Sequence, residues 1–266
     1  MTLVLSEVSK FGVVMVGDSA IESSYNTTDR LPSGSAAPPI YRSGCDKVKL
    51  VPHHPIGISF WGMGKIGDVP TDMWLDDYVR NIVKPEDKFA DICEQLKERV
   101  NHDMTLSGNH GRGGFHVGTV MQPDNGPSIP AIYHIHNDNG DGEWIAFAVQ
   151  EDIPFGLGIS VDHYLAELDR GIWRFLRNGY TESFARLQNS IFTAIDELAR
   201  TRGILVPYPE DMISHEKFAR LQVGLFCDLF ALSNQPPAVG RPITSLTIDL
   251  QGKTTYTSAL SDLTHL

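Results

Sequence analysis

The sequence is poor in features that mark several large classes of protein. Its 266 residues include three scattered cysteines, Cys45, Cys93 and Cys227, which form neither a paired framework nor a metal motif. No apolar run is long enough to cross a bilayer, and no basic segment opens a signal peptide. Acidic residues outnumber lysine and arginine by 33 to 22, and the net charge of −11 argues against nucleic acid as a partner. We therefore expect a cytoplasmic protein without a membrane or nucleic-acid partner.

The N-terminal stretch TLVLSEVSKFGVVMVGDSA predicts a β-hairpin. Residues 2–8 are β-prone with partial alternation, and residues 13–16 form an apolar run typical of a strand buried on both faces. The intervening Ser-Lys-Phe-Gly predicts a tight turn, because Gly12 can adopt a positive φ. Such a hairpin would fix residue 2 at the start of a strand and carry Asp18 back beside it.

The rest of the chain separates into runs of strands and runs of helices. Strand patterns occupy 47–51, 56–61, 115–122, 131–137, 143–150 and 243–250, and helical spacing occupies 71–82, 89–100, 165–175, 184–198 and 218–232. This segregated order favours a layered α+β fold over an alternating parallel sheet, and two antiparallel sheets between helical layers would bury every apolar face. We expect one domain over 1–266, with a long loop rich in Ser, Thr, Pro and Gly at about 22–46.

Thr2 becomes a candidate nucleophile if Met1 is removed; otherwise it is an ordinary second residue. A threonine hydroxyl needs a base, and the α-amino group of the same residue can serve because its ordinary pKa is about 7.7–8.0. A neighbouring lysine would favour the neutral amine, a carboxylate would orient that lysine, and the N–H of a glycine turn would bind the oxyanion. Lys47 and Lys49 both compete for the lysine role, since they alternate onto one strand face.

The opening of the chain resembles that of the proteasome β-subunit and of the related HslV-type bacterial peptidase. The matching positions, without a gap, are Thr2, Gly12, Asp18 and Ser19. The family lysine opens a strand in a K-V motif, which favours Lys47 over Lys49, and the family glycine after the next strand corresponds to Gly62. Further on, IPAIYHIHNDNGDGEWIAFAV resembles the family's central hairpin, and PPAVGRPITSLTIDLQGK resembles its last glycine turn and strand.

The resemblance implies a four-layer αββα N-terminal nucleophile (Ntn) hydrolase and a threonine endopeptidase enclosed in self-assembled homo-oligomeric rings. Thr2 Oγ would attack the peptide carbonyl, Lys47 would set the local field, Asp18 would orient Lys47, and Gly62 N–H would bind the oxyanion. The implied partners are a peptide or unfolded-protein substrate and an ATP-dependent unfoldase, with no cofactor or metal. His134 and His136 alternate on one strand face as metal ligands can, but the sequence places no further ligand beside them.

Several positions depart from the family pattern. The loop at 22–46 is longer than the family's link, and 203–217 is predicted to be a helical insertion. The family's G-S-G, whose serine contacts the terminal amine, is replaced by FGLGIS, which makes Ser160 the nearby candidate. Near the last turn Ser233 is a candidate without an aspartate in register, Asp228 being only a remote one. Two other functions fit: a catalytically silent ring-forming subunit, or an Ntn amidase for a small non-peptide amide.

Overall fold

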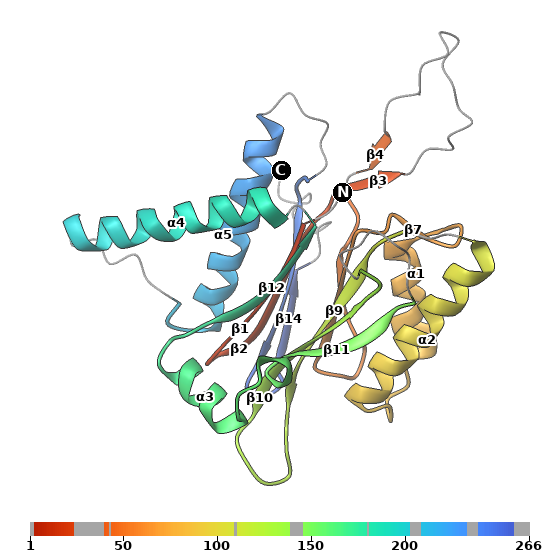
Figure 1. Ribbon diagram of the computed structural model, residues 1–266, viewed down its shortest axis with the longest axis horizontal. Coiled ribbons are helices and arrows are strands. Elements are labelled where there is room, and N and C mark those ends of the chain that lie inside the picture. The colour runs from red at the N-terminus through yellow and green to blue at the C-terminus, as the bar shows by residue number, and fades with distance from the viewer. Residues whose placement is uncertain are drawn as a thin grey trace.

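The structure is a computed structural model that describes residues 3–23, 40–42, 44–108, 111–138, 146–179, 181–202, 209–232 and 239–257. Two five-stranded antiparallel sheets face each other, and the larger helices lie outside them (Figure 1). The predicted α+β class with two antiparallel sheets is confirmed. Within the described part of the chain, no helix combines the length and the apolar character that crossing a membrane requires.

The first sheet is built on the predicted N-terminal hairpin. Its strand order is β12 (Arg174–Gly179), β1 (Leu3–Ser9), β2 (Gly12–Asp18), β13 (Ile243–Asp249) and β14 (Thr254–Thr257). Gly12 opens β2 with a φ of 131°, and a Cβ on it would lie 2.1 Å from the Ile248 carbonyl oxygen. Positive φ and close backbone approach thus both require glycine at this turn. The antiparallel pairing of β1 with β2 brings Asp18 to the same end of the sheet as Leu3.

The second sheet has the order β11 (Ala148–Ile153), β10 (Ile129–His136), β9 (Gly114–Met121), β6 (Ile56–Trp61) and β5 (Val48–Leu50). Two short pairs lie beside the large sheets. They are β3 (Ile21–Ser23) with β4 (Ile40–Arg42), and β7 (Lys65–Ile66) with β8 (Val69–Pro70). The pairing of β3 with β4 falls within the predicted loop at 22–46, most of which lies outside the described residues.

The helices cover the sheets through apolar faces. They are α1 (Thr71–Asp77), which continues into a π-helical turn (Tyr78–Ile82), α2 (Phe89–Ser107), α3 (Val161–Asp169), α4 (Thr181–Arg202) and α5 (Met212–Ala231). One core packs α1 and α2 on the second sheet, and another packs α4 and α5 on β1 and β2. A third core lies between the sheets, where Val13 and Met15 of β2 share a cluster with Val120 and Ile132.

One expected helix is in part a strand. The periodicity of Leu165, Leu168, Ile172 and Phe175 predicts a single helix, but α3 ends at Asp169, and Gly171 follows with a φ of 81°. Phe175 lies in β12, which pairs with β1 from Val8↔Arg174 to Leu3↔Gly179. The free edge of β1 offers a ladder of backbone hydrogen bonds, and this long-range pairing overrides the local helical pattern.

Two other expectations fall partly outside the described residues. The strand expected from residue 143 begins at Ala148, and 139–145, which hold most of the predicted hairpin turn, are not described. In the expected insertion at 203–217, the described part runs from residue 209, and α5 begins at Met212. The single-domain assignment and the two insertions remain predictions.

Candidate active site

Asp18 gathers donors from three parts of the chain at the end of β2. Its side chain is fully buried, and Oδ1 accepts hydrogen bonds from Leu3 N–H at 2.8 Å and Lys47 Nζ at 2.5 Å. Oδ2 accepts from Ala20 N–H and Gly240 N–H, both at 3.0 Å. The carboxylate therefore joins the first described residue of β1 to the Lys47 ammonium and to the Gly240 turn. Every lone-pair direction that a carboxylate offers has a donor.

Lys47 is the partner that makes this site unusual. Its side chain is 0% exposed, although lysine is almost never fully buried unless paired. Its carbonyl accepts from Phe60 N–H at 3.2 Å, which ties the residue to β6, the strand that leads to Gly62. Removing a lysine ammonium from water costs several kcal/mol even after the protein relaxes around it, so a buried Lys–Asp pair is weak evidence for stability. Such pairs are common at functional sites.

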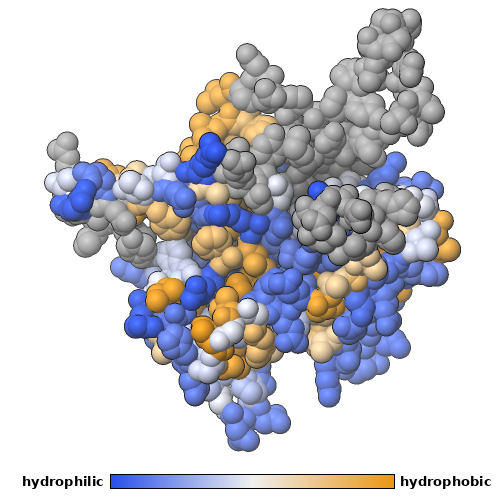
Figure 2. All heavy atoms as spheres, viewed as in Figure 1, coloured by the Kyte–Doolittle hydropathy of each residue, from blue (hydrophilic) through white to orange (hydrophobic). Residues whose placement is uncertain are grey.

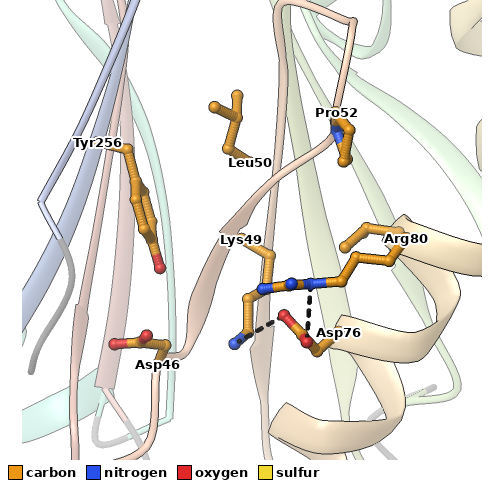
Figure 3. A pocket seen from close by; sticks show the side chains of 8 residues that line it. Asp46, Lys49, Leu50, Pro52, Asp76, Arg80 and Tyr256 are labelled. Atoms are coloured by element: carbon orange, nitrogen blue, oxygen red, sulfur yellow. Dashed lines mark ion pairs between the residues drawn. The ribbon is translucent and has the colours of Figure 1, made fainter. Parts of the chain in front are cut away.

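The structure separates the two lysines that alternation had left equivalent. Lys49 lies 3.5 Å from Asp76 of α1, and Asp76 is also 2.9 Å from Arg80. These residues line a cavity of about 360 Å³ between β5, β14 and α1, with Asp46 and Tyr256 on the opposite wall (Figure 3). Lys49 therefore forms its ion pair with Asp76 of α1, whereas Lys47 contacts Asp18 directly.

Gly62 follows β6 directly and forms a turn with a φ of 80°. That φ lies in the left-handed region, which exposes a backbone N–H in a direction that L-residues rarely provide. The turn lies at the end of the sheet that Trp61 and Gly114 share as a cross-strand pair. It packs against the glycine-rich segment 111–113, since a Cβ on Gly62 would lie 2.5 Å from the Arg112 carbonyl oxygen.

Within the described part of the chain, none of the remaining candidate residues forms a hydrogen bond with Asp18. Thr2 and Ser233 lie outside the described residues. Ser160 is the N-cap of α3, where its Oγ accepts from His163 N–H at 3.2 Å. Helix α3 leads into the Arg174 end of β12, which pairs with Val8, so this helix lies toward the end of the sheet away from Asp18 (Figure 1). Asp228, the remote acidic candidate, pairs with Arg241 through two hydrogen bonds of 2.7 and 2.8 Å.

Two buried thiols near the Asp18–Lys47 pair are poor nucleophiles. Burial raises the pKa of Cys45 to about 12, partly offset by the Lys47 charge. Burial also raises the pKa of Cys227 to about 12, with the Asp18 charge adding to the effect. A protonated thiol is a weak nucleophile, so these cysteines do not compete for chemistry here.

The predicted histidine pair lies on the second sheet, stacked ring on ring. The His134 and His136 ring centroids are 4.2 Å apart, and Trp61 Nε1–H donates to His134 Nε2 at 3.1 Å. Burial lowers the pKa of His134 to about 2, which keeps it neutral beside Asp152, 3.6 Å away. Among the described residues, no three His, Cys, Asp or Glu side chains gather closely enough to hold a metal ion.

Sequence reasoning missed two contributors to the site. Gly240 lies in the recognised final glycine turn, but its donation to Asp18 depends on a contact across 222 residues of sequence. Asn137 follows β10, and its side-chain amide forms hydrogen bonds with backbone atoms of the segment beside Gly62. A single asparagine after a strand carries no sequence signal of such a role, because its partners are backbone atoms.

Comparison with known proteins identifies solved structures with a similar fold. No protein-family model and no curated protein sequence matches the chain. Among solved structures it is similar to an Anbu (Gly-1) mutant from Hyphomicrobium sp. strain MC1, with 12% identity over 97% of this chain and 87% of that one and a TM-score of 0.53. It is also similar to Anbu (ancestral beta-subunit) from Yersinia bercovieri, with 11% identity, coverage of 97% and 88%, and a TM-score of 0.52.

These findings correct the family assignment. The expectation of a proteasome β-subunit or HslV-type peptidase is wrong, because the similar solved structures are Anbu proteins and no sequence match supports either of the named families. The quoted motifs are short and mark the geometry of a hairpin and a strand end, which related folds share. At 11–12% identity the likeness shows a shared fold and leaves activity to be argued from the site.

Proposed function

We propose that this chain is a proteasome-like subunit with the four-layer αββα Ntn fold that assembles with copies of itself and hydrolyses amide bonds through Thr2. The observation that carries the proposal is the fully buried Lys47–Asp18 pair, which also holds the Leu3 N–H. The amide that follows residue 2 is thereby fixed beside an ammonium group. An N-terminal nucleophile requires this combination of a fixed strand start and a nearby positive charge.

The chemistry follows from these positions. With Met1 removed, the Thr2 Oγ attacks the substrate carbonyl carbon while its proton passes to the neutral α-amine of the same residue. The Lys47 charge favours that neutral amine, and Asp18 holds Lys47 in place. The Gly62 N–H stabilises the oxyanion. The amine then protonates the leaving nitrogen, and water hydrolyses the resulting ester, returning the proton to Oγ.

Self-assembly is supported by an apolar stripe on α5. Leu221, Leu225, Leu229 and Leu232 recur every three or four residues and are 36–84% exposed. Figure 2 shows hydrophobic side chains gathered over the C-terminal part of this helix. The one exposed acidic side chain among them, Asp228, is paired with Arg241. An apolar patch of this kind marks an interaction site, and a chain of net charge −11 meets a copy of itself best through an uncharged face.

The silent ring-forming subunit is the second candidate, and one observation favours it. Ser160, the candidate for the serine expected beside the terminal amine, caps α3 instead. Without that serine the amine has one fewer hydrogen-bond partner to orient it. An unfoldase partner and the cytoplasmic location remain predictions.

The test combines mass and activity. Intact-mass spectrometry of the purified chain should show the loss of one methionine, and fluorogenic peptides should be hydrolysed. Thr2→Ala should abolish hydrolysis and leave the particle mass in light scattering unchanged. Retained activity in Thr2→Ala refutes the proposal, and an intact Met1 on an assembled, inactive particle favours the silent subunit. Small amides tested beside the peptides separate an amidase from a peptidase.

A further inference from the structure

We propose that Asn137 is a positioning residue that sets the Gly62 turn by holding the glycine segment 111–113 against it. The inference rests on the proposed function, in which the Gly62 N–H binds the oxyanion. It assigns a role to the HGRGG sequence at 110–114, which by sequence alone is a weak nucleotide-binding pattern. The described part of that motif serves as a support for the turn.

Gly62 and Gly113 pack closely against each other through their backbone atoms. A Cβ on Gly62 would lie 2.8 Å from Gly113 Cα, as well as 2.5 Å from the Arg112 carbonyl oxygen. A Cβ on Gly113 would lie 2.5 Å from the Trp61 carbonyl oxygen and 3.0 Å from Met63 N. Contacts this short with backbone atoms cannot be relieved by rotating a side chain. The position of segment 111–113 therefore fixes the position of the peptide groups on both sides of Gly62.

Asn137 holds that segment through three hydrogen bonds. Its Oδ1 accepts from Gly113 N–H at 2.9 Å, its Nδ2–H donates to the Gly111 carbonyl at 3.0 Å, and its own N–H donates to the Gly113 carbonyl at 3.3 Å. The residue is 0% exposed. Such bonds are expensive to break, because an unsatisfied buried polar group costs about 1–3 kcal/mol.

The ion pair made by Arg112 is a weaker tether of the segment. Arg112 forms an ion pair with Asp138, but both side chains are substantially exposed, at 44% and 30%. Exposed ion pairs contribute about 0–1 kcal/mol, since water screens the charges and the side chains lose entropy. Asn137 is therefore a buried tether of the segment beside Gly62, whereas the Arg112–Asp138 pair is an exposed one.

The consequence for catalysis is geometric. An oxyanion donor acts only when it lies within hydrogen-bond distance of the developing charge, and removing one such donor costs about 10²–10³ in kcat. A shift of about 1 Å is enough to lose much of that effect. Loosening segment 111–113 should then lower kcat while leaving the ground-state binding of substrate, and hence KM, nearly unchanged.

The test uses Asn137→Asp, which keeps an acceptor for Gly113 N–H and replaces the donor to Gly111 with an oxygen. Asn101→Asp is the matched control, because Asn101 clamps the backbone of Phe147 in the same way, with bonds of 2.7 Å to its N–H and 3.0 Å to its carbonyl. We expect kcat for a fluorogenic peptide to fall at least about tenfold in Asn137→Asp, with KM within about twofold. The control should keep both values.

Two further measurements test the inference, and the second of them, hydrogen exchange, requires no enzymatic activity. The affinity for a peptide boronate, which mimics the tetrahedral intermediate, should fall in parallel with kcat. Hydrogen exchange of the Gly62 and Met63 amides should accelerate at least about tenfold in Asn137→Asp and remain unchanged in Asn101→Asp. Asn137→Ser, which replaces the amide with a shorter hydroxyl side chain, provides a second variant if the aspartate prevents folding.

The outcomes separate this inference from the proposed function. Unchanged exchange at Gly62 in a folded Asn137 variant overturns the inference, whether or not the chain is an enzyme. Equal loss of kcat and rise of KM also overturns it, because that pattern indicates general damage to the site. Accelerated exchange in Asn137→Asp, combined with a wild-type chain that hydrolyses nothing, supports the positioning role of Asn137 and counts against the proposed function.

Discussion

Two buried carboxylates, those of Asp18 and Glu7, differ in the groups that surround them. Asp18, at the end of the hairpin, is bonded to a lysine and to three backbone N–H groups. Glu7, in the middle of β1, is bonded to side chains of α5: His215 Nε2 at 2.9 Å and Gln222 Nε2 at 3.1 Å. Both carboxylates are at most 1% exposed. Burial and full hydrogen bonding alone therefore do not distinguish a site from a structural tie.

The difference lies in the partners and their place in the fold. The Glu7 network continues through Gln222 to Gln188 of α4, and through His215 to Ser9, whose Oγ is 3.1 Å from His215 Nδ1. All these groups are buried between one sheet and its covering helices. The Asp18 network lies at a strand end, beside the start of the chain, and includes a full positive charge. Four variants test these buried groups, from the largest effect to the smallest.

The largest effect is expected from Asp18→Asn. The substitution removes the charge that holds Lys47 and leaves a buried ammonium without a counter-ion, which costs about 3–5 kcal/mol of unfolding free energy. We expect kcat for the fluorogenic peptide to fall at least about a hundredfold per folded molecule, measured with denaturant unfolding on the same sample. Lys47→Met, which keeps the backbone donors to Asp18, should show the same loss of activity. A folded variant of either kind with wild-type kcat would contradict the assignment.

An intermediate effect, on stability alone, is expected from Glu7→Gln. The new amide would face two donors, His215 Nε2 and Gln222 Nε2, so at least one bond is lost, at a cost of about 1–3 kcal/mol. The midpoint of urea unfolding should fall while kcat per folded molecule stays within about twofold. If Glu7→Gln instead lowers kcat as Asp18→Asn does, the distinction between site and structural tie fails.

The smallest effect near neutral pH is expected in the pH dependence of stability, from His116 between the sheets. Its ring nitrogens are bonded to Ser6 Oγ at 2.9 Å and to Asn178 Oδ1 at 2.6 Å, and His134 and His136 lie on its own sheet. Burial lowers the pKa of His116 to about 4, below the value of 6.5 for the exposed group. The unfolded chain therefore binds the extra proton first, and stability is lost as pH falls from about 6.5 toward 4.

His116→Gln removes this titration and keeps a polar side chain. The difference in unfolding free energy between wild type and His116→Gln, followed by urea unfolding from pH 7 to pH 4, should shrink as pH falls. Its total change is expected to be on the order of 1–3 kcal/mol. A difference that is constant with pH would show that His116 is not the group responsible.

The features that could be predicted from the sequence are those that local residue patterns determine. The hairpin turn at Gly12 and the α+β order followed from alternation, apolar runs and turn residues, and the structure confirms both. The edge strand β12 was missed because its stability comes from pairing with β1, more than 160 residues away, and not from its own periodicity. The contact between Asp18 and Lys47 was expected from a family resemblance that proved wrong in its assignment, and the catalytic roles remain proposals. Asn137 was out of reach because its partners are backbone atoms of a distant segment.

The central claim, that Thr2 is the nucleophile, is tested most directly by trapping it. The purified assembly is incubated with a peptide β-lactone, which acylates a nucleophile and remains attached, and the digested chain is mapped by mass spectrometry. We predict one adduct, on the peptide that begins with Thr2 after loss of Met1, and none in Thr2→Ala. An adduct on another residue, or a chain that reacts with Met1 still attached, would contradict the account.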